Sequence, residues 1–434
     1  MITKVVLKNF KCFGEPEKEI ELKPLTIFVG PNGSGKSTVL QAIGLLAQSA
    51  KASHERSGLL WDGELVRLPS QKDMFHKRDA KLWLKIGLFM ELDPESIAQR
   101  LGERKVERPP FIDWAQIEAR RWPAGYSVEY CKDTDLYQHT LYLGDQLIAE
   151  TTSHLTYRDR TSSSYHSSLK LPSLWPDREF LPKETGRILS GNLFKLRDIT
   201  PAPPAPVAIV ENLHKFFDIL TECMSEKLSN AHYLHDERSP DLKLRAEILS
   251  SNKYQQVQKE IEKWVEVFGM EHLLAGLRRE GLGADYIDPH FQVALDLNLA
   301  GYGSRQLLPV ITDLFWAKPG SLIMVEEPEI SLHPESQARL MEMFAESVSE
   351  GRQVIITTHS EILLLALPRA IEKLPAAKIA VYEFEKSSEG VSIKRLEVSE
   401  DGYIRGWVPS FTKAVSNLTE EWFEKVGRKV GDEE

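Results

Sequence analysis

The segment 30–38, GPNGSGKST, constrains the fold of this chain more than any other feature of its sequence. It fits the pattern G-x-x-x-x-G-K-[ST], in which glycines let successive backbone N–H groups turn inward around phosphate oxygens. The apolar run 25–29 before it predicts a strand, and apolar positions at helical spacing from Val39 to Ala50 predict a helix after it. A strand, a glycine-rich loop and a helix N-terminus form an anion site, so we expect an α/β fold that binds a nucleotide.

Each side chain of this phosphate loop has an expected role. Lys36 would reach the β- and γ-phosphates, and the Ser37 hydroxyl would ligate Mg²⁺. The alternative is a glycine-rich turn without a ligand, but the position between a strand and a helix favours the nucleotide. We therefore predict ATP and Mg²⁺ as ligands, held in this loop by Asn32, Gly33, Ser34, Gly35, Lys36, Ser37 and Thr38.

Two adjacent carboxylates follow a second buried strand. The segment 322–334, LIMVEEPEISLHP, places Glu326 and Glu327 where an apolar run ends. Ligands of open α/β sheets lie beyond the carboxyl ends of the strands, and successive strand residues point in opposite directions. We therefore assign Glu326 to the metal and Glu327 to the attacking water; the alternative is a pair of solvated acids.

A histidine follows the next apolar run. TTHS comes directly after the apolar run QVII, so His359 should lie at the same edge of the sheet as the carboxylates. A neutral imidazole there could bind the γ-phosphate or the attacking water, whereas the alternative is a core histidine bound to backbone. His333 is open between a helix cap and a contact with another subunit.

Hydrophobic periodicity divides the rest of the chain into three predicted regions. Alternation in 80–93 and in about 126–156 predicts an antiparallel sheet within region 1–170, with a polar loop at 161–168. Region 171–290 should be mainly helical and contains the Pro-rich segment 200–207, a candidate linker. Region 291–434 should hold the two buried strands, a strand pair and a terminal helix.

Composition limits the functional classes. Lys and Arg total 54 against 64 Asp and Glu, and the resulting net charge of −10 argues against a surface built for nonspecific nucleic-acid binding. The basic and aromatic residues of 103–122 could still contact DNA, or form a solvated face. Three scattered cysteines and the short apolar runs predict a cytoplasmic protein without a membrane span.

Several motifs together resemble the ABC-type ATPases. These are the GPNGSGKST loop, a distant G-S-x-Q element, the apolar strand ending in Glu-Glu, and the THS ending. Within that class the chain is similar to the branch with the SMC, RecF and overcoming-lysogenization-defect (OLD) proteins, and EEPEISLHPESQ is especially similar to OLD-type ATPases. HYLHDERSP and DGYIRGWVPSF resemble stand-alone bacterial ATPases of phage-defence operons.

The resemblance implies an ABC-type ATPase head: a mixed sheet with a P-loop core, an attached antiparallel β subdomain and a helical insertion lobe. Such heads pair face to face around two ATP molecules, so it implies a homodimer or a higher homo-oligomer. The signature position is GYGSRQ, and Gly303 and Ser304 would face the γ-phosphate of the other subunit. Lys11 resembles a basic residue that contacts nucleotide, and Gln71 is the candidate glutamine that senses the metal; a solvated lysine and a surface glutamine are the alternatives.

We expect no TOPRIM nuclease domain after His359 and no long coiled-coil arms. This favours an ATPase subunit that controls a separate effector, a nuclease or a toxin, in anti-phage defence. The alternative is a RecF- or SMC-like DNA-binding ATPase in repair or replication. A transporter-associated or translation-associated ABC protein, which needs a partner domain or tandem heads, fits poorly.

Overall fold

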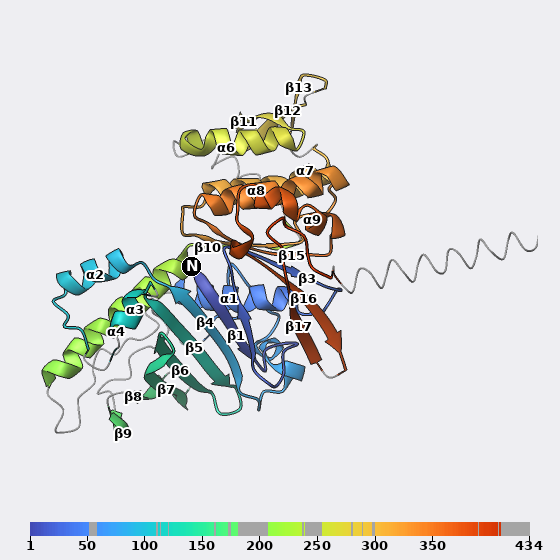
Figure 1. Cartoon of the computed structure of the whole chain (residues 1–434). Helices are drawn as coiled ribbons and strands as arrows, with labels where there is room; N and C mark the ends of the chain where they lie inside the picture. Colours follow the sequence, from blue (N-terminus) through green and yellow to red (C-terminus); the bar gives the residue numbers. More distant parts are fainter. Residues whose placement is uncertain are drawn as a thin grey trace, which may run out of the picture. The chain divides into compact units, whose positions relative to one another are not determined.

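The chain divides into two compact units whose segments alternate along the sequence. The first contains Met1–Lys23, Ser37–Tyr233 and Gly320–Met324; the second contains Pro24–Lys36, Leu234–Pro319 and Val325–Glu434. Figure 1 shows this computed structural model. It describes residues 1–51, 59–109, 112, 114–119, 121–159, 162–171, 175–180, 207–236, 238, 254–278, 281–288, 290–296, 300–388, 390–406 and 408.

The first unit is built on an antiparallel sheet of eight strands in the order β2-β1-β4-β5-β6-β7-β8-β9. Its strands are β1 (Ile2–Lys8), β2 (Lys18–Glu21), β4 (Leu84–Glu91), β5 (Pro123–Cys131), β6 (Leu136–Leu143), β7 (Gln146–Asp159), β8 (Ser162–Leu171) and β9 (Trp175–Phe180). Alternating apolar residues such as Leu84, Ile86 and Leu88 are buried on one face. The predicted antiparallel β subdomain is confirmed.

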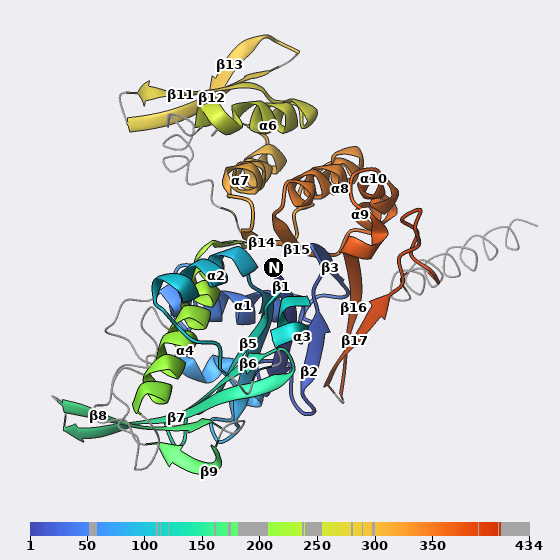
Figure 2. The same cartoon turned by 60° about the vertical axis from the view of Figure 1, so that its left-hand side comes forward.

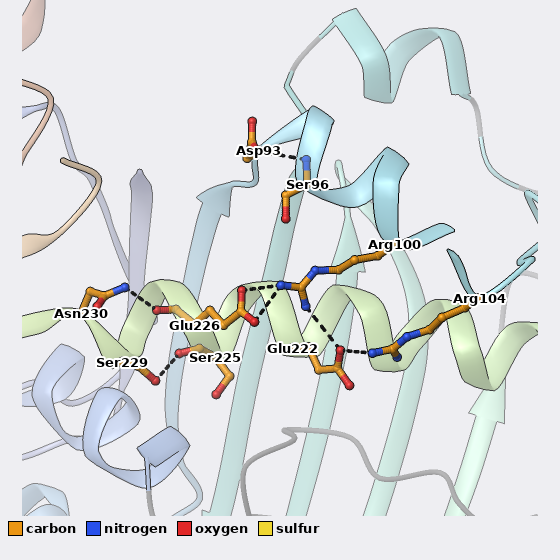
Figure 3. A network of polar contacts seen from close by, with 9 residues as sticks. All are labelled: Asp93, Ser96, Arg100, Arg104, Glu222, Ser225, Glu226, Ser229 and Asn230. Carbon is orange, nitrogen blue, oxygen red and sulfur yellow. Dashed lines mark hydrogen bonds and ion pairs between the residues drawn. The ribbon is translucent and has the colours of Figure 1, made fainter. Parts of the chain in front are cut away.

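Helices α1 (Lys36–Lys51), α2 (Pro94–Glu103), α3 (Trp114–Ala119) and α4 (Val207–Ser229) accompany this sheet. The apolar face predicted for α1 is buried at Val39, Ile43, Leu46 and Ala50. Helix α2 packs along α4 through ion pairs (Figure 3), in which Arg100 binds Glu222 and Glu226 and Arg104 binds Glu222. These pairs are partly exposed, so each contributes about 1 kcal/mol or less.

The second sheet is mixed and has the strand order β10-β14-β15-β3-β16-β17. Its strands are β10 (Ala231–Leu234), β14 (Leu322–Glu326), β15 (Gln353–Thr358), β3 (Leu25–Val29), β16 (Ile379–Ser387) and β17 (Gly390–Leu396). Strand β3 runs parallel to both β15 and β16, and β16 pairs antiparallel with β17. Every residue of β3, β14 and β15 is buried, as their continuous apolar sequences predict.

Helices of the second unit form layers beside this sheet. Helix α8 (Pro334–Ser349) packs on β15 and β3, and α9 (Glu361–Leu365) and α10 (Leu367–Ile371) pack on α8. Helix α7 (Tyr302–Trp316) contacts α8, and α6 (Tyr254–Val267) lies on α7 (Figures 1 and 2). A three-stranded antiparallel sheet, β11 (Glu271–Arg278), β12 (Gly281–Asp288) and β13 (Val293–Asp296), packs on α6 through β11. The predicted mixed α/β fold class is confirmed.

The structure differs from the sequence prediction in two segments. The expected polar loop at 161–168 contains most of strand β8, because backbone pairing with β7 does not require apolar side chains. The helical pattern from 211 to 280 also contains strands β10 and β11, and β11 closes a hairpin with β12. The segment 200–206 of the predicted linker and the terminal helix expected beyond 408 lie outside the described residues.

Among the described residues, no helix combines the length and the apolar character that crossing a membrane requires.

Candidate functional site

The phosphate loop begins at the carboxyl end of β3, between two parallel neighbours. Val29, the last residue of β3, pairs with Thr358 at the end of β15 and with Glu383 in β16. Gly30 follows with a φ of 147°, and a Cβ there would overlap the carbonyl oxygen of Phe384. Only glycine therefore fits where the chain leaves the sheet to form the loop.

The Lys36 side chain turns back into the loop. Its Nζ donates to the carbonyl oxygens of Gly30 at 2.9 Å and Pro31 at 3.1 Å, and lies 2.9 Å from Nε2 of His359. The residue is only 5% exposed, and burial lowers the pKa of its ammonium to about 8 even though Glu327 and its acidic neighbours oppose the shift. Lys36 thus carries a charge that the folded protein disfavours, which phosphate oxygens would stabilise.

The two adjacent carboxylates lie at the end of β14. Glu326 ends the strand and is 7% exposed. Glu327 has a φ of 42°, an unusual conformation for a residue with a Cβ, and its N–H donates to the Thr357 carbonyl at 2.9 Å. Burial raises the pKa of the Glu327 carboxyl, although Lys36 lowers it in part. A raised pKa makes this carboxylate a stronger proton acceptor than a solvated one.

His359 lies between these opposite charges. Its Nε2 is 2.9 Å from Lys36 Nζ and 3.2 Å from Glu327 Oε1. Burial, followed by the charge of Lys36, lowers the pKa of the ring, so the neutral form prevails at pH 7. In the neutral tautomer whose hydrogen is on Nδ1, Nε2 accepts a hydrogen bond from Lys36. In the other tautomer the hydrogen is on Nε2, which can then donate to Glu327. The structure thus brings together three predicted residues from separate segments, Lys36, Glu327 and His359.

Glu329 is a polar residue of this cluster that the sequence interpretation did not single out. Its Oε1 accepts from the Thr358 hydroxyl at 2.6 Å and from the His359 N–H at 2.8 Å. Its Oε2 is buried without a hydrogen-bond partner among the described residues. Glu329 therefore fixes the backbone that carries His359; its position two residues after the acidic pair was the only sequence signal.

Arg238 is a second residue that the sequence interpretation missed. It is 4% exposed, and its guanidinium donates to the carbonyl oxygens of Glu326 and Glu327. Gln306, in the predicted signature segment, exchanges two hydrogen bonds with the Arg238 backbone. The segment HYLHDERSP, which contains Arg238, was quoted only for its resemblance, and no role was assigned to Arg238 because that role depends on contacts across the fold.

The predicted signature residues open helix α7, beside the turn that precedes α8. Gly301 is the N-cap of α7, and Gly303 and Ser304 lie in its first turn. A Cβ on Gly303 would lie 2.5 Å from the carbonyl oxygen of Ser331, so a side chain there would displace this turn. His333 caps α8, with Nδ1 accepting from the Glu335 N–H at 3.4 Å. The cap is therefore observed for His333, and a contact with another subunit stays a prediction.

The remaining predicted residues belong to the first unit. Ser37 and Thr38 continue α1 directly after Lys36, and Thr38 Oγ1 lies 3.5 Å from the thiol of Cys12. Lys11 donates to the side chain of Gln41. Gln71 donates to the Tyr130 hydroxyl at 2.8 Å, so any contact with a metal would require this bond to break.

The donor groups fit a nucleotide with Mg²⁺. The Ser34 hydroxyl is buried in the phosphate loop without a hydrogen-bond partner in the described part of the chain, and the Lys36 ammonium is bound to the loop's own carbonyls. Among the residues that the structure describes, no group of three or more His, Cys, Asp or Glu could hold a metal ion alone. Mg²⁺ is usually held by one or two protein oxygens together with phosphates and water. Ser37 and Glu326, the residues predicted to bind the ion, each carry an oxygen of this kind.

Comparisons with known proteins identify the family. A family model described as "AAA domain, putative AbiEii toxin, Type IV TA system" matches residues 145–366, about half of the chain. The chain belongs to this AAA family. A second model, "AAA ATPase domain", matches residues 1–173 and covers the phosphate loop. The chain is thus an ATPase of the AAA type, and the expected resemblance to OLD-type proteins is confirmed over a short segment.

Individual relatives of this AAA protein match less strongly. An OLD nuclease of Thermus scotoductus is 46% identical over 46 residues, which span 11% of this chain and 8% of the nuclease. The SMC head domain from Thermotoga maritima has 15% identity and a TM-score of 0.42, covering 92% of this chain and 99% of that one. An Smc head domain from Pyrococcus furiosus, bound to the C-terminal domain of ScpA, has 13% identity and a TM-score of 0.46, with 96% and 98% covered.

Proposed function

We propose that this protein binds Mg-ATP and hydrolyses it to ADP and phosphate at the phosphate loop. The observation that carries the proposal is the convergence of Lys36, Glu327 and His359 beyond the ends of three buried strands. His359 Nε2 lies 2.9 Å from Lys36 Nζ and 3.2 Å from Glu327 Oε1. An ammonium, a carboxylate and an imidazole at a phosphate loop are the groups that a triphosphate and its attacking water require.

Each group of the cluster has one proposed role. The loop from Asn32 to Thr38 surrounds the phosphates, and Lys36 leaves its carbonyl partners to bind the β- and γ-phosphates. Ser37 and Glu326 hold Mg²⁺, which would neutralise charge on the phosphates. Glu327 orients a water and accepts its proton, and His359 holds the γ-phosphate or that water. Lys11 and Gln71 are proposed as further contacts to nucleotide and metal.

We further propose that two copies of the chain assemble around the nucleotide. The first turn of α7, with Gly303 and Ser304, is a helix N-terminus, which attracts anions because the first N–H groups of a helix point out of its end with partial positive charge. In each chain this turn would complete the site of the other. ATP would favour the assembly and hydrolysis would loosen it.

The cellular role we propose is anti-phage defence, in which the ATPase holds or releases a separate effector protein. The support is the match to part of an OLD nuclease and the toxin–antitoxin description of the family model. A DNA-binding role in repair has weaker support, because Arg100 and Arg104 are bound to acidic residues of α4 and Arg108 lies over the Trp114 ring. Affinity for DNA with a steep dependence on salt would favour the repair role.

Mixing two inactive variants tests the shared site. Glu327→Gln should bind ATP without hydrolysing it and should form an ATP-dependent oligomer, measured by sedimentation. Ser304→Arg should block the site of its partner, while its own loop stays intact. One composite site in a mixed dimer then contains neither substitution, so mixing should restore part of the hydrolysis. If the mixture stays inactive while both variants bind ATP and form dimers, the site is not shared.

A further inference from the structure

The guanidinium of Arg238 ends among backbone carbonyl oxygens of separate segments. It donates to the carbonyl oxygens of Glu326 and of Glu327, the latter at 2.8 Å. It also donates to the carbonyl oxygens of Gln306 at 3.3 Å and His235 at 2.8 Å. Glu326 is the last residue of strand β14, Glu327 follows it, and Gln306 lies in helix α7. The Arg238 side chain therefore joins the end of strand β14 to helix α7, which begins with the predicted signature.

Gln306 completes the connection from the side of α7. Its Oε1 accepts from the Arg238 N–H at 3.1 Å, and its Nε2 donates to the Arg238 carbonyl at 2.8 Å. It is 5% exposed. The amide side chain therefore satisfies both backbone groups of Arg238 and fixes the residue against the helix, one turn after Tyr302.

The backbone of Glu327 needs such support. Its φ of 42° is costly for a residue with a Cβ, and such conformations persist only when the surroundings hold them. Its N–H donates to Thr357, and its carbonyl accepts from Arg238 and, at 3.2 Å, from the Ile330 N–H. Loss of Arg238 would remove the bond that ties this strained residue to α7.

We infer that Arg238 and Gln306 form a latch that positions the Glu327 carboxylate and couples it to the start of helix α7. Arg238 is a positioning residue, because its described contacts reach the backbone of Glu327 rather than the reacting atoms. The inference rests on the proposed function, in which Glu327 accepts a proton and the first turn of α7 meets the partner's nucleotide. Movement of α7 on assembly would then change the position of Glu327.

The geometry requires arginine. A guanidinium has five donors in a rigid fork and can bind carbonyls from several directions, whereas the three donors of lysine radiate from one atom. Arg238→Lys therefore keeps the positive charge but cannot keep the connection between the strand and the helix.

Arg352 supplies a matched control in the same unit. It is 7% exposed and donates to the carbonyls of Ala317 at 2.7 Å and Phe315 at 3.3 Å, at the opposite end of α7. Arg352→Lys makes the same chemical change at a contact with the same helix α7, away from Glu327. The two variants thus separate loss of stability from loss of position.

Steady-state ATP hydrolysis and melting temperature test the latch. We expect Arg238→Lys to lower kcat about 100-fold with KM nearly unchanged, since small misplacements of catalytic groups have effects of that order. Arg352→Lys should lower the melting temperature as much and keep kcat. Gln306→Leu should reproduce the kcat loss, and the double variant should lose little more. Wild-type kcat in Arg238→Lys, or equal kcat losses in both lysine variants, overturns the inference.

Hydrogen exchange tests the latch without hydrolysis. Arg238→Lys should speed exchange in peptides that contain Glu327, whereas Arg352→Lys should speed it at the carboxyl end of α7. Unchanged protection around Glu327 in Arg238→Lys overturns the inference. If the wild-type protein binds Mg-ATP but hydrolyses none, the proposed function fails and the exchange result alone decides the latch.

Discussion

Two histidines show how differently this chain uses the same side chain in its two units. His139 in the antiparallel sheet is 1% exposed, and its Nδ1 lies 2.7 Å from the hydroxyl of Tyr126. His359 is half-buried between the Lys36 ammonium and the Glu327 carboxylate. Burial lowers the pKa of both rings, so both are neutral at pH 7, and the charges of Lys36 and Glu329 also act on the pKa of His359.

The difference separates a structural cluster from a functional one. Burial raises the pKa of the Tyr126 hydroxyl, which stays protonated and shares a hydrogen bond with His139 Nδ1, so both groups of this bond are satisfied without charge. Around His359, by contrast, burial disfavours the charges of Lys36 and Glu327. Groups held against their ordinary protonation preference mark functional sites, where stability is given up for chemistry.

Removal of the carboxylate beside His359 should give the largest effect. Glu327→Gln should slow ATP hydrolysis by about 10²- to 10⁴-fold, because the amide cannot accept the proton of the attacking water. ATP affinity, measured by calorimetry, should stay near the wild-type value. Glu342→Gln is the control, since Glu342 binds Arg339 and Arg369 on the surface of the same unit. Equal hydrolysis by Glu327→Gln and the wild type would disprove the assigned role.

The buried His139 should make the folded protein less stable in acid. Its pKa falls from 6.5 to about 3 on folding, so the unfolded chain binds more protons between these values and stability falls as pH drops from 6.5 toward 3. At pH 4.5 this one group should remove about 3 kcal/mol of unfolding free energy relative to pH 7. Between pH 7 and pH 4.5 the unfolding free energy, measured with urea, should fall by about that amount less in His139→Phe than in the wild type. Identical losses would show that His139 is protonated in the folded state.

Lys36 should have opposite effects on stability and on binding. Lys36→Met removes a buried ammonium, so the nucleotide-free protein should melt at the same or a higher temperature. ATP affinity should fall about 10- to 100-fold, because charge-assisted hydrogen bonds to phosphate contribute about 1.5–3 kcal/mol. Calorimetry and thermal melting measure the two effects. Unchanged affinity, or a strong loss of nucleotide-free stability, would place Lys36 with the structural cluster.

The sequence predicted one of these clusters and not the other. Lys36, Glu327 and His359 each follow an apolar strand in a short motif, and the rule that ligands gather at carboxyl ends of parallel strands brings them together. His139 and Tyr126 lie in alternating strands that predict the sheet, but their partnership depends on the register of β5 with β6.

Residues that act through backbone contacts were also missed. Arg238 and Glu329 bind carbonyl and N–H groups of the motif residues, and such contacts leave no pattern of residue types in a single sequence. Local periodicity likewise could not separate β11 from the helical pattern before it, because strand pairing is a tertiary choice. Motifs therefore located the reacting groups, and only the fold located their supports.

The smallest effect should come from the neutral partner of His139. Tyr126→Phe removes the hydroxyl and with it the hydrogen bond to the buried Nδ1 of His139, which should cost about 1–2 kcal/mol of unfolding free energy at pH 7. Adding His139→Phe should restore part of that loss, because replacing both partners with apolar rings leaves neither member of this bond unpaired. A double-mutant cycle in urea therefore gives the coupling between the two rings. Near-zero coupling would show that packing, rather than the hydrogen bond, holds His139 neutral. ATP hydrolysis should stay unchanged in all three variants, because neither residue belongs to the proposed catalytic cluster.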